Sequence, residues 1–194
     1  MIQTLRHLRH IVDWNLRGKP APPPHVVKQR AIKSYQKRFG LQVFVETGTY
    51  LGEMIDALKS SFRELYSIEL SEELYGRAVQ RFAADAHVRI MQGDSGDVLP
   101  RILERVSEPC LFWLDGHFSG GITAQGALDF PILKELEHIG RHTVKNHVIL
   151  IDDARFFSGE MDAPDRAQIS ASLREINPAY RIEEKDDIIR AFVG

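Results

Sequence analysis

From residue 41 onward, short apolar runs alternate with helical patterns, and this alternation constrains the fold more than any other feature of the sequence. The apolar runs have the length of strands and span residues 41–45, 64–69, 87–91, 110–114 and 147–151. Strands that alternate with helices form a parallel sheet, and right-handed crossovers place the helices on both of its faces. The sequence therefore predicts an α/β fold with a doubly wound, mostly parallel sheet.

Helix signals fill the gaps between these strands. Helices are expected after Gly52, after Ser71, over 99–106, over 123–139 with a bend or restart at Pro131, and over 165–176. Ser71 suits a helix N-cap because its hydroxyl can accept a hydrogen bond from a backbone N–H of the first turn. Residues 180–184 and 188–193 flank the polar run Lys185-Asp186-Asp187, which predicts that the chain ends in a hairpin.

The first 40 residues differ from the rest in charge. They contain nine Lys or Arg and one acid, a net charge of +8, whereas residues 41–194 contain sixteen Lys or Arg and 26 acids, a net charge of −10. Apolar residues at helical spacing predict a helix that ends near Leu16, and a second helix is expected over 25–39 after a proline-rich connector. We therefore divide the chain into a basic helical N-terminal arm, residues 1–40, and a domain over residues 41–194.

Several roles for the arm stay open at this point. Opposite charges could dock the arm on its own body, or it could contact a second copy, an anionic substrate or a membrane surface. The first helix is amphipathic and would suit a homodimer.

Ligands of doubly wound sheets bind beyond the carboxyl ends of the strands, so the residues that follow each strand carry the functional information. The first strand is followed by Glu46-Thr47-Gly48-Thr49-Tyr50-Leu51-Gly52. Gly48 can adopt a positive φ or admit a ligand close to the backbone, and Gly52 lets the loop turn into a helix. The G-x-x-x-G spacing differs from the dinucleotide fingerprint G-x-G-x-x-G, and a plain turn is the alternative interpretation.

Two acids follow the next two strands. Glu69 ends the second strand, 21 residues after Gly48, where a carboxylate can accept hydrogen bonds from both ribose hydroxyls. Asp94, in Gln92-Gly93-Asp94-Ser95, could accept a hydrogen bond from an adenine amine or could cap the next helix. Glu69 could equally be a surface acid at the start of a helix.

With these motifs in order, residues 41–153 resemble the class I S-adenosylmethionine (SAM)-dependent methyltransferases. The resemblance implies a Rossmann-like, seven-stranded sheet with an antiparallel last strand, preceded here by the N-terminal helices. It implies that Gly48 and its loop hold the methionine part of SAM, that Glu69 holds the ribose and that Asp94 lies beside the adenine. The residues that it assigns to cofactor binding are Glu46, Thr47, Gly48, Thr49, Tyr50, Gly52, Glu69, Gly93, Asp94, Ser95 and Asp115.

The fourth and fifth strand ends add three carboxylates. Asp115 follows the fourth strand, and Asp152 and Asp153 follow the fifth. Neighbouring carboxylates repel one another unless a cation joins them, and Mg²⁺ prefers oxygen ligands. The pattern is similar to metal-dependent O-methyltransferases of the catechol and caffeoyl-CoA type, which implies that Asp115, Asp152 and Asp153 bind a divalent metal, Mg²⁺ above all. The alternative is that Asp115 binds substrate while Asp152 and Asp153 cap local structure.

The chemistry expected at these residues is direct methyl transfer to an oxygen. The sulfonium methyl is already activated, so the protein mainly has to align a nucleophile behind it. A divalent ion on the acceptor oxygen would lower its pKa. His117, two residues after Asp115, is the expected general base, with Asp115 as the second catalytic residue. Gly120-Gly121 could hinge a lid over residues 116–123.

The sequence thus predicts a SAM-dependent methyltransferase that acts on a small-molecule acceptor. The alternative is a non-catalytic SAM-binding module that engages a partner through its basic arm. Nucleic acid is disfavoured as an acceptor because the body is acidic, and an NAD oxidoreductase is disfavoured because G-x-G-x-x-G is missing. No apolar run reaches the roughly 18 residues of a membrane span, and a cytoplasmic location is expected. The one cysteine, Cys110, is expected to be a buried hydrophobe.

Overall fold

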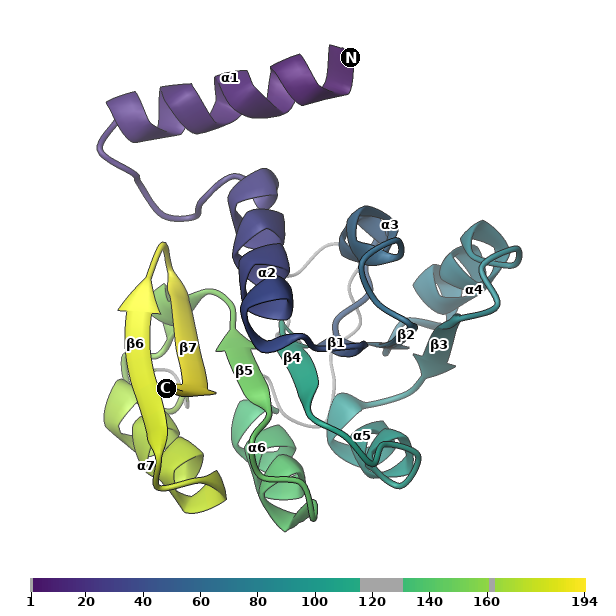
Figure 1. Cartoon of the computed structure of the whole chain (residues 1–194), viewed down its shortest axis with the longest axis vertical. Helices are drawn as coiled ribbons and strands as arrows, with labels where there is room; N and C mark the ends of the chain where they lie inside the picture. Colours follow the sequence, from purple (N-terminus) through teal and green to yellow (C-terminus); the bar gives the residue numbers. More distant parts are fainter. Residues whose placement is uncertain (1, 116–130, 161–162) are drawn as a thin grey trace.

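A seven-stranded sheet forms the centre of the molecule (Figure 1). The computed structural model describes residues 2–115, 131–160 and 163–194, with side chains from residue 8 onward. The strand order is β3-β2-β1-β4-β5-β7-β6, with β7 antiparallel to both neighbours and the other strands parallel. The strands are β1 (Val43–Thr47), β2 (Glu64–Glu69), β3 (Val88–Gln92), β4 (Cys110–Leu114), β5 (Val148–Ile151), β6 (Tyr180–Lys185) and β7 (Ile188–Val193). The predicted α/β, doubly wound sheet with an antiparallel last strand is confirmed.

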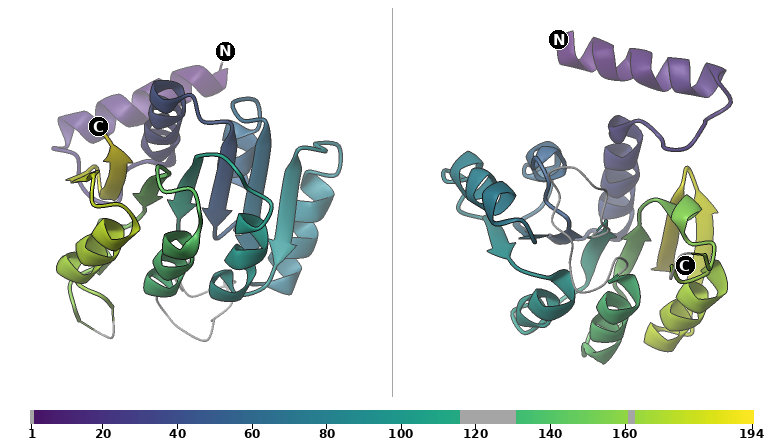
Figure 2. Two further views of the ribbon diagram at one scale, coloured as in Figure 1. Left: turned by 60° about the horizontal axis from the view of Figure 1, so that its bottom comes forward. Right: turned by 180° about the vertical axis from the view of Figure 1, so that it is seen from behind.

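Helices cover both faces of the sheet in two layers (Figures 1 and 2). One layer holds α2 (His25–Phe39), α3 (Glu53–Leu58) and α4 (Glu72–Arg81), and the other holds α5 (Ser95–Leu103), α6 (Ile132–Arg141) and α7 (Arg166–Ile176). A short 3-10 turn, η1 (Ala154–Phe156), follows β5. The alternation of β-strand and helix therefore gives the arrangement that the sequence predicts, with helices on both faces of the sheet.

Local sequence signals explain where several helices begin and end. Ser71 caps α4 by accepting a hydrogen bond from the Leu74 N–H, as predicted. Asp165 and Gln168 form a capping box at the start of α7, so two otherwise unpaired backbone N–H groups are satisfied. Gly40 ends α2 in the left-handed conformation, at φ 65°. These signals lie within a few residues of sequence, which is why the ends of α2, α4 and α7 could be predicted.

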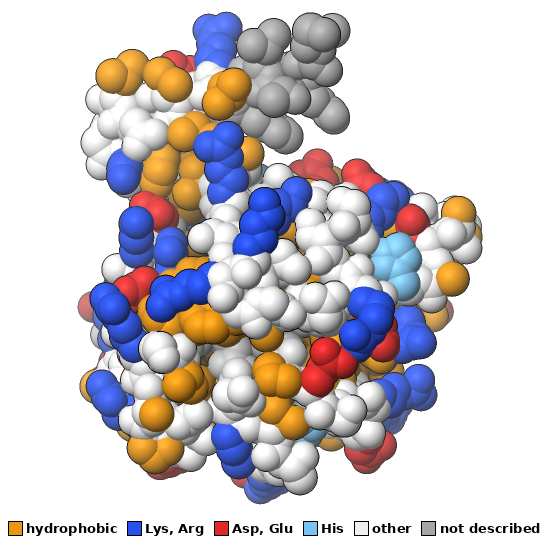
Figure 3. Space-filling view, viewed as in Figure 1, with side chains coloured by type: hydrophobic (Ala, Val, Ile, Leu, Met, Phe, Trp, Pro, Cys, Tyr) orange, Lys and Arg blue, Asp and Glu red, His pale blue; other side chains and the backbone are white. Residues whose placement is uncertain are grey.

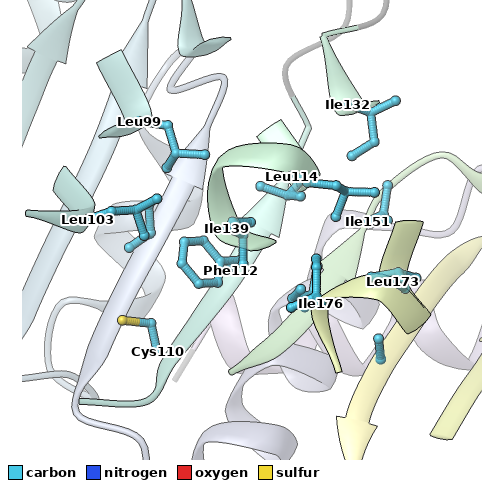
Figure 4. Close-up of a cluster of buried hydrophobic side chains, with 14 of the residues drawn as sticks. Leu99, Leu103, Cys110, Phe112, Leu114, Ile132, Ile139, Ile151, Leu173 and Ile176 are labelled. Atoms are coloured by element: carbon cyan, nitrogen blue, oxygen red, sulfur yellow. The ribbon is translucent and has the colours of Figure 1, made fainter. Parts of the chain in front are cut away.

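The two faces of the sheet are packed by separate hydrophobic clusters. One cluster joins the sheet to α5, α6 and α7, and Figure 4 shows Phe112 and Leu114 of β4 between side chains of these helices. Cys110 is buried in the same cluster, as expected, and burial raises the pKa of its thiol. Burying a side chain of the size of Phe112 stabilises the fold by roughly 1.5–3 kcal/mol. The parallel strands β1, β2, β4 and β5 are buried on both faces, which explains their continuous apolar runs.

The second cluster includes part of the basic N-terminal segment. Ile32 of α2 is fully buried against the sheet, and Tyr35 packs on Phe192 with ring centroids 5.2 Å apart. The first helix, α1 (Ile2–Leu16), lies apart from the sheet at the outside of the molecule (Figures 1 and 2). The side chains of Leu8, Val12 and Leu16 on this helix are exposed, and hydrophobic side chains at its surface can be seen in Figure 3. The two helices of the arm are thus confirmed, but they pack differently.

Three predicted boundaries shift in ways that bear on function. The first strand extends to Thr47, so Glu46 and Thr47 belong to β1 itself. The third strand extends to Gln92, and α5 begins at Ser95 because Asp94 provides the cap. Of the helix expected over 123–139, the described part is α6, which begins after Pro131, while residues 116–130 lie outside the described residues. Within the described part of the chain, no helix is long and apolar enough to span a membrane.

Candidate functional site

The carboxyl ends of β1, β4 and β5 lie side by side at one edge of the sheet. Thr47 pairs with Leu114, and Leu114 pairs with Ile151. The next residues continue this register, since the Asp115 N–H donates to the Thr47 carbonyl at 3.2 Å and the Asp152 N–H donates to the Leu114 carbonyl at 3.0 Å. The residues predicted to act together after the fourth and fifth strands are therefore brought together by the sheet itself.

The loop after β1 adopts the conformation for which its glycines are suited. Gly48 has φ 86° and Gly52 has φ 73°, both in the region that L side chains disfavour. A Cβ on Gly52 would lie 2.8 Å from Cε2 of Phe82, so the loop passes too close to the end of α4 for any side chain. Tyr50 also has a positive φ, 49°, and its side chain is half exposed.

Glu69 connects this loop to the start of α4. Its carboxylate accepts hydrogen bonds from the Tyr50 N–H at 2.8 Å and from the Ser71 N–H at 2.9 Å. Only 5% of Glu69 is exposed, so the carboxylate is held in one orientation at the tip of β2. The two N–H groups occupy one lone pair on each oxygen, and each carboxylate oxygen can accept further hydrogen bonds.

A buried polar chain runs beneath the loop. The hydroxyls of Thr49 and Ser67 are 2.6 Å apart, and the Ser67 hydroxyl donates to the Glu46 carboxylate at 2.6 Å. Burial raises the pKa of Glu46 well above its usual range, with Ser67 acting in the opposite direction. Thr47 accepts a hydrogen bond from the Asp115 N–H at 3.1 Å, which ties β1 to the end of β4. These contacts fix the predicted cofactor residues relative to one another.

The turn after β3 is narrow and is closed by a helix cap. Gly93 has φ 137°, and a Cβ at this position would lie 2.8 Å from a methyl carbon of Val98. Asp94 accepts a hydrogen bond from the Gly96 N–H at 2.9 Å and caps α5, which was one of the two roles expected for it. The adenine contact of Asp94 stays a prediction, and Ser95 is buried beside it.

Glu135 is a buried acid that sequence reasoning missed. It lies in the first turn of α6 and is 1% exposed, and its Oε1 has no hydrogen-bond partner among the described residues. Burial raises the pKa of Glu135 to about 7, while the neighbouring hydroxyls of Ser95 and Thr47 act to lower it. Helical spacing could have found it, because Glu135 lies three residues after Ile132 and one before Leu136, on the apolar side of the helix.

Asp115, Asp152 and Asp153 form an acidic cluster. Each offers a carboxylate oxygen, and the three oxygens lie within 4.8 Å of one another. Asp152 is buried, and burial together with the negative charge of Asp115 raises its pKa. Asp153 has φ 53°, a left-handed conformation that Asp tolerates better than most residues, and its N–H donates to Asp152 Oδ1 at 2.8 Å. The sequence-based expectation that these three carboxylates converge is confirmed.

Lys28, from the N-terminal segment, lies inside this cluster. Its ammonium binds Asp152 Oδ2 closely and Asp153 Oδ1 at 3.2 Å. Burial acts to lower the pKa of Lys28, but the charges of Asp152 and Asp115 outweigh it, so the pKa is raised and the ammonium stays charged. Sequence reasoning did not single out this residue, because it counted Lys28 only as one of the nine basic residues of the arm.

Two further basic side chains border the cluster. Arg155 donates to Asp153 Oδ1 at 2.8 Å and also pairs with Asp187 in the β6–β7 turn. The side chain of His25, one helical turn before Lys28, is 43% exposed, and desolvation of its covered part together with Lys28 lowers its pKa, against opposing effects of Glu53 and Asp115. His117 and the lid expected over 116–123 lie outside the described residues, so the expected general base stays a prediction.

The arrangement of strands can be compared with solved structures, whereas no protein-family model and no curated protein matches the sequence. An O-methyltransferase from Bacillus cereus, solved in complex with SAH, superposes with a TM-score of 0.61 and 14% identity over 97% of this chain and 90% of that one. A structure described as a caffeoyl-CoA O-methyltransferase from Staphylococcus aureus gives 0.59 and 15% identity over 100% and 92%.

The chain has the fold of the class I SAM-dependent methyltransferases. This fold carries different acceptors, since the 23S rRNA methyltransferase ErmE also superposes, with a TM-score of 0.52 and 14% identity over 85% of this chain and 68% of that one. At such low identity the likeness establishes the fold alone. In a methyltransferase fold, the nature of the acceptor must be argued from the site.

Proposed function

We propose that this protein is a SAM-dependent methyltransferase that transfers a methyl group to an oxygen of a small-molecule acceptor. One observation supports the proposal above the others: the ends of β1, β2, β4 and β5 bring the glycine loop, Glu69 and the acidic cluster to one edge of a class I methyltransferase sheet. This edge is where doubly wound sheets bind their ligands.

The residues at this edge fit SAM in chemistry. The carboxylate of Glu69 has the oriented oxygens that two ribose hydroxyls require. Gly48 carries no side chain that would oppose close backbone approach by the methionine part, and its positive φ would strain any other residue there. The acids Asp94 and Glu135 lie near Ser95 at the start of α5, where the adenine is expected. These features support the cofactor assignment that the sequence suggested.

The proposed reaction is a direct displacement. The acceptor oxygen attacks the methyl carbon of the sulfonium, the C–S bond breaks with its electrons returning to sulfur, and SAH is released with the methylated acceptor. The protein aligns oxygen, methyl and sulfur and supplies a group that receives the hydroxyl proton. Asp115 borders the site from β4, and His117 is the expected base.

The divalent metal that the sequence resemblance implies has a competitor in this site. Carboxylate oxygens of Asp115, Asp152 and Asp153 are suitable ligands for Mg²⁺ in type and number. The ammonium of Lys28, however, already binds two of the three carboxylates. The three carboxylates thus fit a cation, and the cation that they contact in this structure is the ammonium of Lys28.

A non-catalytic SAM-binding module is the alternative function. The exposed apolar side chains of α1 favour it, because a helix that stands apart from the body can engage a partner. The buried charges around Asp152 favour an enzyme, since clusters of perturbed titratable groups at the edge of a sheet are typical of active sites.

Titration calorimetry with SAH tests the proposal. We expect wild-type protein to bind SAH in the micromolar range, because SAH has the ribose, adenine and amino acid of the cofactor. Glu69→Gln should lower the affinity at least tenfold, equivalent to about 1.4 kcal/mol, since it replaces an acceptor oxygen with a donor. The matched control is Glu72→Gln, an exposed acid in the first turn of α4.

The outcome that overturns the proposal is equally direct. Wild-type protein that is folded by circular dichroism but shows no heat of binding with millimolar SAH lacks the proposed site. Equal affinity of the Glu69→Gln and Glu72→Gln variants would remove Glu69 from it.

A further inference from the structure

The acidic cluster is already neutralised in part by a side chain from another element. Lys28 donates to Asp152 and Asp153, and the side chains of Lys28 and Asp152 are 12% and 0% exposed. Asp152 and Asp153 follow β5, whereas Lys28 is separated from them by more than 120 residues of sequence. The pair is therefore a feature of the tertiary fold rather than a local ion pair.

The hydrophobic core determines where Lys28 lies. Lys28, Ile32 and Tyr35 occur at positions i, i+4 and i+7 of α2, so they share one face of the helix. Ile32 is fully buried, and the Tyr35 hydroxyl donates to the Glu183 carboxylate at 3.0 Å. Because these contacts set the rotation of α2, the same face directs Lys28 at the acidic cluster. Lys28 is not an exposed lysine that swings into a site.

An ammonium and a divalent ion compete for the same carboxylates. A magnesium ion would lie about 2.0–2.1 Å from each ligating oxygen. Asp152 Oδ2 and Asp153 Oδ1 are the atoms that Lys28 contacts, so an ion placed among the three carboxylates would lie next to the ammonium. Like charges at such a distance repel strongly in a site that is largely buried. Binding of the ion thus requires displacement of Lys28 from its buried position.

We propose that Lys28 is the permanent cation of the acidic cluster and takes the place of a divalent metal ion. The ammonium has three N–H donors and, among the described residues, gives one to each of two carboxylates. Arg155 provides a second fixed positive charge at Asp153. If the proposed methyl transfer holds, the reaction at this edge of the sheet proceeds without added metal.

Manganese binding to the full-length chain tests this inference. Electron paramagnetic resonance measures free Mn²⁺ in titrations of wild-type protein, Lys28→Met and Lys37→Met. Methionine keeps the length of the side chain without its charge, and Lys37 is the control because it is an exposed lysine of the same helix. We expect wild type and Lys37→Met to bind Mn²⁺ no tighter than millimolar, and Lys28→Met to bind at least tenfold more tightly. Adding Asp152→Asn to Lys28→Met should abolish the gain.

Each other result overturns the inference. Micromolar binding of Mn²⁺ by wild type that is lost in Asp152→Asn would show that a metal coexists with Lys28. A folded Lys28→Met variant with no gain would show that Lys28 does not compete with an ion. If Lys28→Met fails to fold, the wild-type and Asp152→Asn titrations still show whether a metal ion binds beside Lys28 or whether Lys28 is the cation of the cluster. SAH calorimetry on the same samples reports separately on the proposed function, since failure to bind SAH leaves the manganese result unchanged.

Discussion

At the scale of the residue, the carboxyl of Glu135 shows how burial sets a charge. Its folded-state pKa is about 7, because burial disfavours the carboxylate, against an ordinary value of 4.5. Between these two values the folded state keeps a proton that the unfolded state releases, so stability is lost as pH rises through this window. An ionised Glu135 therefore opposes folding at pH 8.

Replacement of this carboxyl should stabilise the protein at high pH. We expect Glu135→Gln to exceed wild type in the free energy of unfolding by about 2–3 kcal/mol at pH 8, with little difference at pH 4.5. Urea denaturation at the two pH values measures this, and Glu137→Gln, an exposed change in the same helix, is the control. A gain that is the same at both pH values would contradict the burial argument.

Residues were predictable where their function follows a strand and obscure where it depends on tertiary placement. Glu69 ends β2 and Asp115 directly follows β4, two strands that the apolar runs revealed, so their places at the sheet edge could be read from sequence. Lys28 could not be placed, because its function depends on how α2 packs across the sheet. Glu135 was missed because it was counted only as one residue of the helix expected over 123–139. Its place on the apolar side of that helix was not considered.

At the scale of the element, two histidines join β4, β5 and the end of α6. The Cys110 N–H donates to His147 Nδ1 at 3.0 Å, and His147 Nε2 lies 3.0 Å from His142 Nδ1. His142 Nε2 lies 3.0 Å from the Val106 carbonyl. Because Nδ1 of His147 accepts from an N–H, His147 must be the neutral tautomer with its proton on Nε2. His147 Nε2 then donates to His142 Nδ1, and His142 Nε2 donates to the Val106 carbonyl.

These hydrogen bonds of His147 and His142 make part of the protein's stability depend on pH. Burial lowers the pKa of His147 to about 3 from 6.5. Between these values the unfolded state binds a proton that the folded state does not bind. The contribution of neutral His147 to the stability is therefore fully present above pH 6.5 and is lost as pH falls toward 3. We expect the stability of wild type to fall more steeply between pH 6 and 4 than that of His147→Asn, by up to about 1.4 kcal/mol per pH unit.

Urea denaturation at several pH values tests this expectation. His10→Gln, at an exposed position of α1, controls for the loss of any histidine. Parallel pH profiles for wild type and His147→Asn would contradict the proposed neutral tautomer.

The elements themselves were largely predictable, but the extension of β1 depends on a contact with another strand. Bounds matched for β2, β4 and α2, where apolar runs or glycines mark the ends. β1 extends beyond its apolar run because Ser67 satisfies the Glu46 carboxylate, so a buried acid can continue a strand. Such compensation by a residue on another strand is invisible in a single stretch of sequence.

At the scale of the whole molecule, the N-terminal arm has two unequal parts. α2 packs in the core and brings Lys28 to the acidic cluster, whereas α1 lies outside the body with exposed apolar side chains. The division of the chain at residue 40 was drawn on charge, and it stays a prediction. We propose that the catalytic unit includes α2 and that α1 alone is the appendage.

The homodimer suggested by α1 also stays a prediction, with a simple test. If Leu8 and Val12 pack against a second copy, light scattering should report about twice the chain mass of 22.1 kDa. The double variant Leu8→Glu/Val12→Glu should return to the single-chain mass, because it places charges in the apolar contact. His10→Glu, on the opposite side of α1, is the control. A single-chain mass for wild type at all concentrations would rule the dimer out.

The most direct test of the whole account is a crystal structure of the protein with SAH. The account predicts one SAH molecule at the carboxyl edge of the sheet, with both ribose hydroxyls on the Glu69 carboxylate and the sulfur facing Asp115 and the acidic cluster. An SAH molecule bound elsewhere, or one whose ribose does not contact Glu69, would contradict it.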